Sequence, residues 1–301
     1  MKKIIFLLLL TSALRSHAQQ DPLYTHYLFN PFIINPAYAG FSKDASIWAS
    51  YRKQWAGFDG SPETKTVSGH AAFRDNRMGL GLVVLQDKIG NDRNTQVVAS
   101  YAYHLLLKHQ RKISFGLRGG FSNYVLDYSG LTIDDTDPRF QENISEARAV
   151  IGAGLIFSSD RFVVGLSVPN MLNTSTLVNG IATVLYNRHG YAQAAYVLPV
   201  SSRLKVKPFL LARVAPQSSV NFDLGGMLTA DDSYSVGIFT RRLHTYAVFG
   251  KLNIGEALRL GYIFELPTNR SIGIHYPTHE FTLGLRIAFL RSHDLGVVAD
   301  F

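Results

Sequence analysis

Short segments in which apolar and polar side chains alternate recur along most of the chain. In residues 280–289, every second side chain is large and apolar, and the positions between them include Glu280 and Arg286. The same period recurs in residues 112–122, 203–214 and 258–265. Side chains of a strand alternate between its two faces, and charge beside glycine on the second face favours a barrel lumen over the outside of a soluble sandwich. The pattern therefore predicts an all-β chain that forms a transmembrane antiparallel barrel.

The alternation predicts about fourteen strands within residues 43–290. They are expected at 43–55, 62–74, 77–87, 94–106, 111–124, 147–158, 161–168, 187–199, 202–215, 218–230, 233–241, 244–254, 257–265 and 279–290. All connections after even-numbered strands are short, whereas the long ones, at 125–146, 169–186 and 266–278, follow odd-numbered strands. Outer-membrane barrels have short periplasmic turns and longer outer loops, so this arrangement predicts that both termini are periplasmic. Because an unpaired strand edge is costly in lipid, the first strand should pair with the last.

The N-terminal residues predict export, and the C-terminal residues predict a short tail after the barrel. Residues 1–18 have the form of a secretory signal peptide, with Lys2 and Lys3, a short apolar run, and a small-residue cleavage site that ends at Ala18. The chain contains no cysteine, so disulfides are excluded. Residues 291–301 are expected to be a periplasmic tail that is either disordered or added as a strand to a partner. The predicted location is the outer membrane.

Residues 19–42 form an aromatic segment between the signal and the barrel. Pro22, Pro31 and Pro36 interrupt it, and a proline disfavours helix in itself and in the residue before it, so no long helix can run through it. Its aromatic side chains need a surface that covers them. We therefore expect this segment to lie in the barrel lumen or across its periplasmic mouth.

Three motifs resemble the PorP/SprF family of type IX secretion outer-membrane proteins of Bacteroidetes. They are LFNPFIINPAYAG at 28–40, YRKQW at 51–55 and SYAYH at 100–104. The resemblance implies a non-enzymatic role, either linking the outer membrane to periplasmic ring subunits or supporting export and surface anchoring of a large adhesin, as in gliding motility. The implied partners are these secretion subunits, a large secreted adhesin with a C-terminal sorting domain, and outer-membrane lipid. The candidate plug or partner-binding residues are Asn30, Pro31, Phe32, Asn35, Pro36, Ala37, Tyr38, Gly40, Arg52 and Trp55.

Basic residues gather on the predicted polar face. The candidate lumen wall consists of Arg118, Lys205, Lys207, Arg213, Arg259 and Arg286. Two interpretations stay open, a hydrated cationic lumen and a docking wall for an acidic or carboxylate-bearing chain. The formal net charge is +8, but no Lys/Arg run exceeds two residues, so the chain lacks the footprint of a nucleic-acid-binding protein.

No catalytic residues, metal site or cofactor are predicted. The chain has no Gly-x-Ser-x-Gly elbow, and Pro277 separates His275 from His279. The acidic cluster 134–137 lacks the spacing of a calcium loop. Trp48 and Trp55 are expected to anchor the barrel at the membrane interface. The resemblance of YRKQW to the family motif suggests instead that Arg52 and Trp55 contact the opening segment or a partner. The alternative function is a diffusion pore or small-solute transporter.

Overall fold

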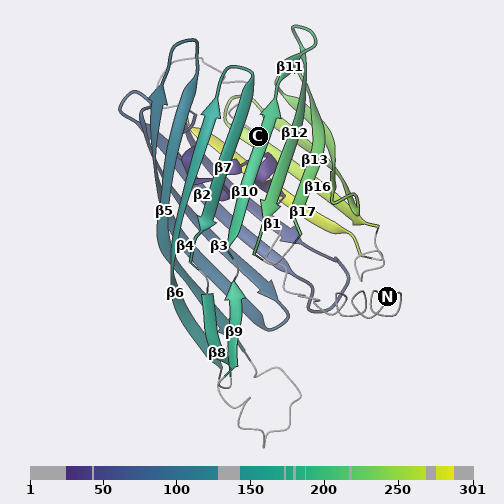
Figure 1. Cartoon of the computed structure of the whole chain (residues 1–301). Helices are drawn as coiled ribbons and strands as arrows, with labels where there is room; N and C mark the ends of the chain where they lie inside the picture. Colours follow the sequence, from purple (N-terminus) through teal and green to yellow (C-terminus); the bar gives the residue numbers. More distant parts are fainter. Residues whose placement is uncertain are drawn as a thin grey trace, which may run out of the picture.

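The structure, a computed structural model, describes residues 25–42, 44–127, 143–172, 174–178, 181–186, 188–216, 219–268 and 276–287. These residues fold into a closed antiparallel barrel of fourteen strands, as the alternation predicts (Figure 1). The strands are β1 (Ala45–Lys53), β2 (Glu63–Phe73), β3 (Met78–Ile89), β4 (Asp92–Leu106), β5 (Lys112–Leu126), β6 (Ile144–Ser158), β7 (Phe162–Asn170), β10 (His189–Tyr196), β12 (Leu204–Val214), β13 (Asn221–Ala230), β14 (Tyr234–Arg241), β15 (Thr245–Ile254), β16 (Leu258–Pro267) and β17 (Thr278–Ile287).

Pairing between the first and last strands closes the sheet. Ala45 lies opposite Ile287 and Lys53 opposite His279, so β1 and β17 pair along their whole length. The remaining neighbours follow one another along the chain, with β10 pairing to both β7 and β12. Each of the fourteen strands thus has a partner on both sides, which closes the sheet.

The two ends of the barrel differ in their connections. We call the end that carries the connections after β2, β4, β6, β10, β13 and β15 the turn end, and the opposite end the loop end. Connections at the turn end are tight: Asp231 and Asp232, between β13 and β14, both adopt left-handed φ values of 50° and 53°, which suit a two-residue hairpin turn. The short strand β11 (Leu198–Pro199) also lies at the turn end and pairs with β12.

A second, two-stranded sheet lies at the loop end, where the sequence predicts a loop at 169–186. Strands β8 (Thr174–Val178) and β9 (Ile181–Tyr186) pair with each other and extend beyond the barrel wall, at the lower end in Figure 1. The connection is long, as predicted, and part of it forms a hairpin that the sequence analysis does not predict. Most of the other two predicted long loops, the acidic cluster 134–137, the signal peptide and the predicted tail lie outside the described residues.

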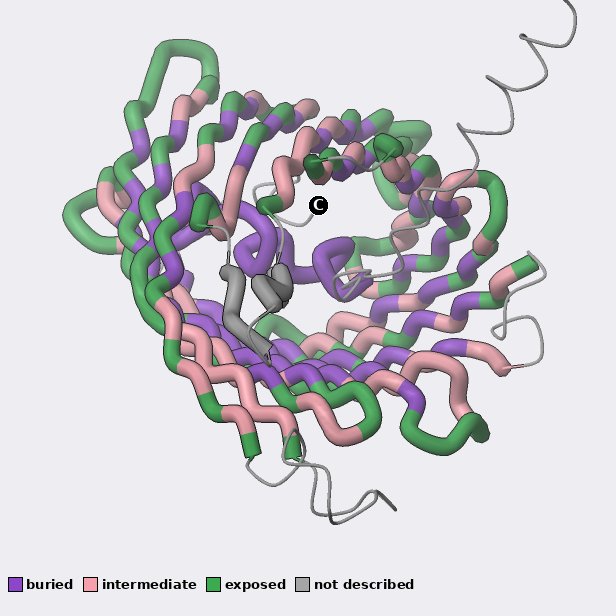
Figure 2. The backbone as a smooth tube through the Cα atoms, turned by 60° about the horizontal axis from the view of Figure 1, so that its bottom comes forward, coloured by how far each residue is buried: buried purple, intermediate pink, exposed green. Residues whose placement is uncertain are grey.

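The barrel wall has an apolar outer face and a polar inner face. Along β17, Phe281, Leu283 and Leu285 are exposed outward, whereas Glu280 and Thr282 are buried toward the lumen. Figure 2 shows the same alternation of exposed and buried positions around the whole ring. An apolar exterior with a polar interior is the arrangement of a membrane barrel.

Trp48 corrects one expectation about this alternation. It is only 4% exposed and lies on the inner face of β1, where Arg259 stacks over its ring at 5.7 Å. A side chain enclosed in the lumen cannot anchor the barrel at a membrane interface, so that interpretation is wrong for Trp48.

Among the residues that the structure describes, no helix combines the length and the hydropathy needed to cross a membrane.

Candidate functional site

Residues 25–41, which we call the lumen segment, lie inside the barrel and are almost entirely buried (Figure 2). They form three single-turn 3-10 helices: η1 (His26–Leu28), η2 (Pro31–Ile33) and η3 (Pro36–Tyr38). The last two each begin with a proline, whose fixed φ suits the first helical position and whose missing N–H needs no partner there. The Asn35 side chain also caps η3 by accepting a hydrogen bond from Ala37 N (3.0 Å). The Asn-Pro pairs thus produce a compact, kinked chain that fits a lumen.

The start of the lumen segment is bound to carboxylates at the loop end. Glu280 accepts hydrogen bonds from the backbone N–H groups of Thr25 and His26, both at 3.1 Å, and lies 3.0 Å from His26 Nδ1. The Thr25 hydroxyl donates to Glu265. Tyr27 donates to Asp223 Oδ2 at 2.9 Å.

Two arginines from other strands complete this charged cluster, which we define as Arg52, Asp223, Arg241, Glu265 and Glu280. Arg52 contacts both oxygens of Glu265, at 2.7 and 3.1 Å, and Glu280 at 3.2 Å. Arg241 binds Asp223 through two hydrogen bonds of 2.9 Å and contacts Glu265 at 3.3 Å. All five side chains are buried, and only such mutual pairing makes the burial of so many charges tolerable.

Arg118 on β5 holds the middle of the lumen segment. Its guanidinium donates to the carbonyl oxygens of Phe32 at 2.7 Å and Ile33 at 2.9 Å. Ser167 on β7 donates to the Ile34 carbonyl at 2.8 Å. Main-chain carbonyls of a 3-10 turn lack internal partners near its end, and the barrel wall supplies donors for them.

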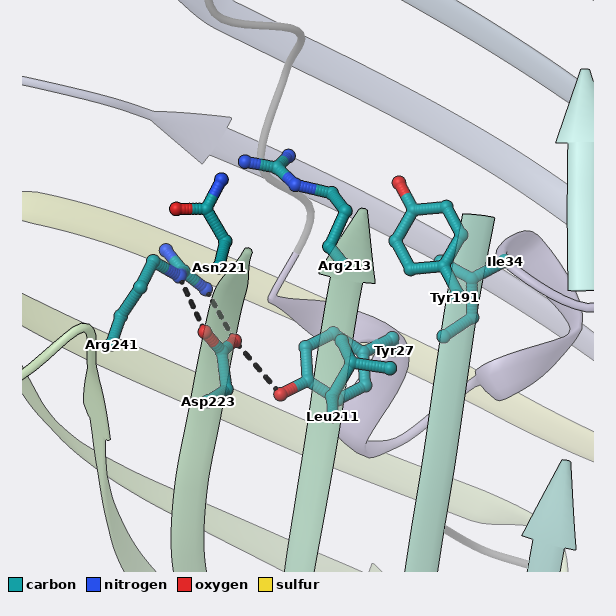
Figure 3. A pocket seen from close by; sticks show the side chains of 8 residues that line it. All are labelled: Tyr27, Ile34, Tyr191, Leu211, Arg213, Asn221, Asp223 and Arg241. Atoms are coloured by element: carbon teal, nitrogen blue, oxygen red, sulfur yellow. Dashed lines mark hydrogen bonds and ion pairs between the residues drawn. The ribbon is translucent and has the colours of Figure 1, made fainter. Parts of the chain in front are cut away.

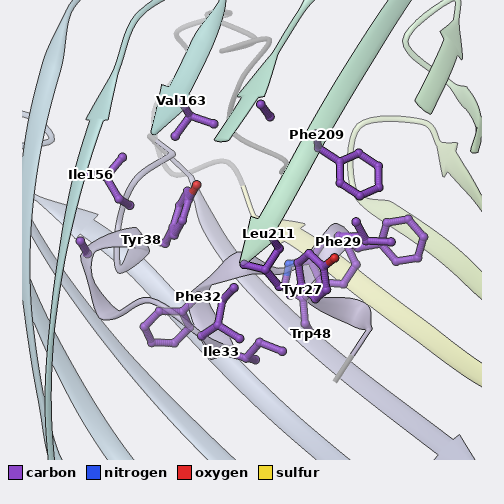
Figure 4. Close-up of a cluster of buried hydrophobic side chains, with 14 of the residues drawn as sticks. Tyr27, Phe29, Phe32, Ile33, Tyr38, Trp48, Ile156, Val163, Phe209 and Leu211 are labelled. Carbon is purple, nitrogen blue, oxygen red and sulfur yellow. The ribbon is translucent and has the colours of Figure 1, made fainter. Parts of the chain in front are cut away.

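The aromatic side chains of the lumen segment form the core of the molecule together with inward-facing wall residues (Figure 4). Phe29 packs edge-on against Phe249, with ring centroids 5.9 Å apart. Phe32 and Tyr38 are fully enclosed, and Gln193 donates to the Tyr38 hydroxyl at 2.6 Å. This packing provides the cover that the sequence requires for these side chains.

At the turn end, the lumen segment passes so close to the wall that only glycine fits. Gly40 has φ +63°, and a Cβ there would lie 2.6 Å from the Cα of Gly79 on β3. His104 Nε2 lies 2.9 Å from the Ala39 carbonyl, and Lys112 donates to the Phe41 carbonyl at 2.7 Å. The segment therefore crosses the whole lumen, from carboxylates at the loop end to the start of β1 at the turn end.

The structure brings most of the predicted plug residues together. Asn30, Pro31, Phe32, Asn35, Pro36, Ala37, Tyr38 and Gly40 all lie in the lumen segment, and Arg52 lies in the charged cluster. Trp55 lies apart from them, in the connection after β1, where its backbone N–H donates to Thr278 at 3.4 Å. Within the described part of the chain, no hydrogen bond or ring contact joins Trp55 to the lumen segment.

The predicted basic wall is not one continuous surface. Arg118 serves the lumen segment, Arg259 stacks on Trp48, and Lys205 and Arg286 pair at the turn end with Asp232 and Asp44. Lys207 and Arg213 are both buried in β12. Most of these cations therefore have structural partners.

Sequence reasoning missed the acidic half of the charged cluster. Asp223, Glu265 and Glu280 lie on β13, β16 and β17, and Arg241 lies on β14. Each occupies an inward position near the loop end of its strand, and that shared position is the only sequence signal that could have grouped them. His279 and Glu280 point to opposite faces, and no group of potential metal ligands occurs among the described residues.

Comparisons with solved structures return outer-membrane proteins at low sequence identity. The Acinetobacter baumannii outer membrane protein Omp33 is 10% identical, with a TM-score of 0.48 over 83% of this chain and 100% of that one. A Pseudomonas aeruginosa FadL homologue is 8% identical, with a TM-score of 0.49 over 91% of this chain and 96% of that one. The chain matches none of the curated proteins with which it was compared.

A protein-family model gives the decisive match. The model, described as type IX secretion system membrane protein PorP/SprF, matches residues 16–285, which include the lumen segment and nearly all of the barrel. The chain therefore belongs to the PorP/SprF family of type IX secretion system membrane proteins.

Proposed function

We propose that this protein is a non-enzymatic outer-membrane component of the type IX secretion system whose lumen is closed by its own N-terminal segment. Family membership supports the assignment to that system. Within it, the proposed role is to support export and surface anchoring of a large secreted protein, or to link the outer membrane to the periplasmic ring. In either role the barrel acts by binding proteins and not by passing solutes.

The observation that carries this proposal is the filled lumen. The lumen segment crosses from the loop end to the turn end, and wall donors such as Arg118 bind its backbone throughout. A diffusion pore needs a continuous water path, and here aromatic side chains occupy that path. A small-solute transporter or pore is therefore the less favoured alternative. In that case the lumen segment would have to leave the lumen so that solutes could pass.

The proposed orientation places the loop end outside the cell and the turn end in the periplasm. Its support is that short turns are typical of the periplasmic side, while the apolar outer face suits lipid. Ile287, at the turn end, is then on the periplasmic side, as the sequence predicts for the C-terminus. Thr25, however, lies at the loop end, so we extend the periplasmic assignment to the C-terminal side only.

Purification of the tagged protein from its native outer membrane, with partners identified by mass spectrometry, tests the proposed role. Recovery of a large surface protein supports the export role, and recovery of periplasmic secretion subunits supports the linking role. The purified protein is also reconstituted in planar bilayers, where a closed lumen predicts little steady conductance. A protein recovered without partners that conducts ions steadily would overturn the proposal in favour of a pore.

Deleting residues 21–40 then tests whether the lumen segment takes part. Loss of the partner on deletion, with the barrel still folded, would locate the contact at or near this segment. Retention of the partner together with a new steady conductance would show that the segment closes the lumen but does not bind the partner.

A further inference from the structure

Arg213, near the loop end of β12, is a buried cation with unused donors. Arg213 is only 6% exposed. Its Nε and Nη1 atoms have no hydrogen-bond partner within the described part of the chain. Buried guanidinium groups are normally paired, because burying an unpaired charge is strongly unfavourable. Arg118, another buried arginine of the wall, shows the usual arrangement with two carbonyl partners. A ligand that accepts hydrogen bonds from these unpaired donors would remove this cost.

Two polar side chains flank Arg213 on the neighbouring strands. Tyr191 on β10 and Asn221 on β13 are its direct cross-strand partners, so all three lie in one row on the inner face. Figure 3 shows the polar ends of these three side chains on the same side of an opening that they line together. Tyr27 and Ile34 of the lumen segment also line this opening, so the segment separates it from the turn end. Access is therefore from the loop end.

The carboxylate that lines this opening has other partners. Asp223 lines the same opening, but it receives two hydrogen bonds from Arg241 and one from Tyr27. Positive charge also accumulates at this rim, where Arg242 donates to Ser219 at 2.8 Å. Burial, and then the charge of Arg213, lower the pKa of Arg242, as expected where two cations lie near each other.

We propose that Arg213 and Asn221, with Tyr191 beside them, form a carboxylate-binding site that opens at the loop end of the lumen. The guanidinium offers charge-assisted hydrogen bonds to a carboxylate, and the Asn221 amide adds a further donor. A monoanion fits better than a phosphate dianion, since Asp223 would repel the greater charge more strongly. The ligand is an acidic side chain or terminal carboxylate of a polypeptide, or a free carboxylic acid. The site does not depend on the role of the barrel in secretion.

Isothermal titration of the purified full-length protein tests this site with two probes, acetate and a tetraglutamate peptide. Both should bind, and Arg213→Met should weaken binding at least about tenfold, because it removes a charge-assisted pair. Arg213→Lys keeps the charge without the planar fork, so it should recover part of the affinity. Tighter binding of the peptide than of acetate would point to a polypeptide ligand, and equal affinity to a free acid.

The matched control is Arg203→Met, which removes the same charge from an exposed side chain at the turn end. It should bind both probes as the unaltered protein does. All variants must keep the folded barrel, as judged by their mobility on unheated detergent gels. Equal losses in both Met variants, or competition by chloride as strong as by acetate, would overturn the carboxylate assignment. Failure of both probes to bind the folded, unaltered protein would also overturn it.

Discussion

Replacing Arg118 with methionine should release the lumen segment from the barrel wall. The guanidinium makes hydrogen bonds of 2.7 and 2.9 Å to the Phe32 and Ile33 carbonyls, and the residue is only 5% exposed. A hydrogen bond to a charged group is worth about 1.5–3 kcal/mol, so the two bonds together contribute roughly 3–6 kcal/mol. Methionine also removes the cost of burying the guanidinium charge, which reduces the loss to about 2–3 kcal/mol for the bound segment. The open population should then rise by about 30- to 150-fold.

Single-channel recording in planar bilayers measures this change directly, as the fraction of time spent conducting. Arg203→Met serves as the charge-matched control, because Arg203 is exposed at the turn end and does not contact the lumen segment. The reasoning is refuted when a folded Arg118→Met barrel opens no more often than the Arg203→Met barrel. In that case Arg118 does not hold the segment, or the segment does not close the lumen.

Three further predictions concern packing, charge and orientation. Gly116→Ala should displace η3 and increase conductance, because a Cβ at this position would lie 2.2 Å from Ala37 N, and overpacking of this kind typically costs about 1–3 kcal/mol. Glu265→Gln should lower the midpoint of denaturant unfolding by an amount equivalent to about 3–5 kcal/mol, since it leaves two buried arginines with one fewer counter-ion. In the otherwise cysteine-free chain, Asp59→Cys at the loop end should react with a membrane-impermeant maleimide on intact cells, whereas Asp231→Cys at the turn end should not.

Each of these predictions has a control substitution elsewhere in the chain. Gly119→Ala, on the same strand as Gly116, should be neutral because no atom lies within 4 Å of its added Cβ. Glu63→Gln removes a surface pair with Lys65 and should change stability by less than about 1 kcal/mol. Equal effects in the glycine pair would contradict the close approach to Ala37, and equal effects in the glutamate pair would contradict the importance of the charged cluster. Labelling of Asp231→Cys from outside would reverse the proposed orientation.

The sequence predicts the barrel well, because the alternation of apolar and polar residues along a strand indicates which of its faces is apolar. Strand β17 was expected at 279–290 and lies at Thr278–Ile287, and the other thirteen agree similarly. The β8–β9 hairpin was missed although its sequence carries a signal. Asn179-Gly180 separates two runs rich in β-branched residues, and this dipeptide is typical of a tight hairpin.

The charged cluster could not be predicted, because its members are neighbours only in the closed barrel. Arg52 and Glu280 come from the first and last strands, and become cross-strand partners only when β1 pairs with β17. A single-residue slip in that register would turn Glu280 toward the outer face. Sequence patterns define the two faces of each strand, whereas the register between strands decides which inward residues meet.

The two ends of the lumen segment differ in how they can be released. At the turn end, the segment continues into β1, and Gly40 lies against the backbone of Gly79, so movement there must distort the wall. At the loop end, Thr25 is held by carboxylates through hydrogen bonds that water or another polypeptide can replace. Release should therefore begin at the loop end and proceed past Arg118 toward the turn end. A partner that binds the charged cluster from the loop end would weaken the contacts that break first. Such a partner would need to supply only part of the free energy that holds the whole segment in the lumen.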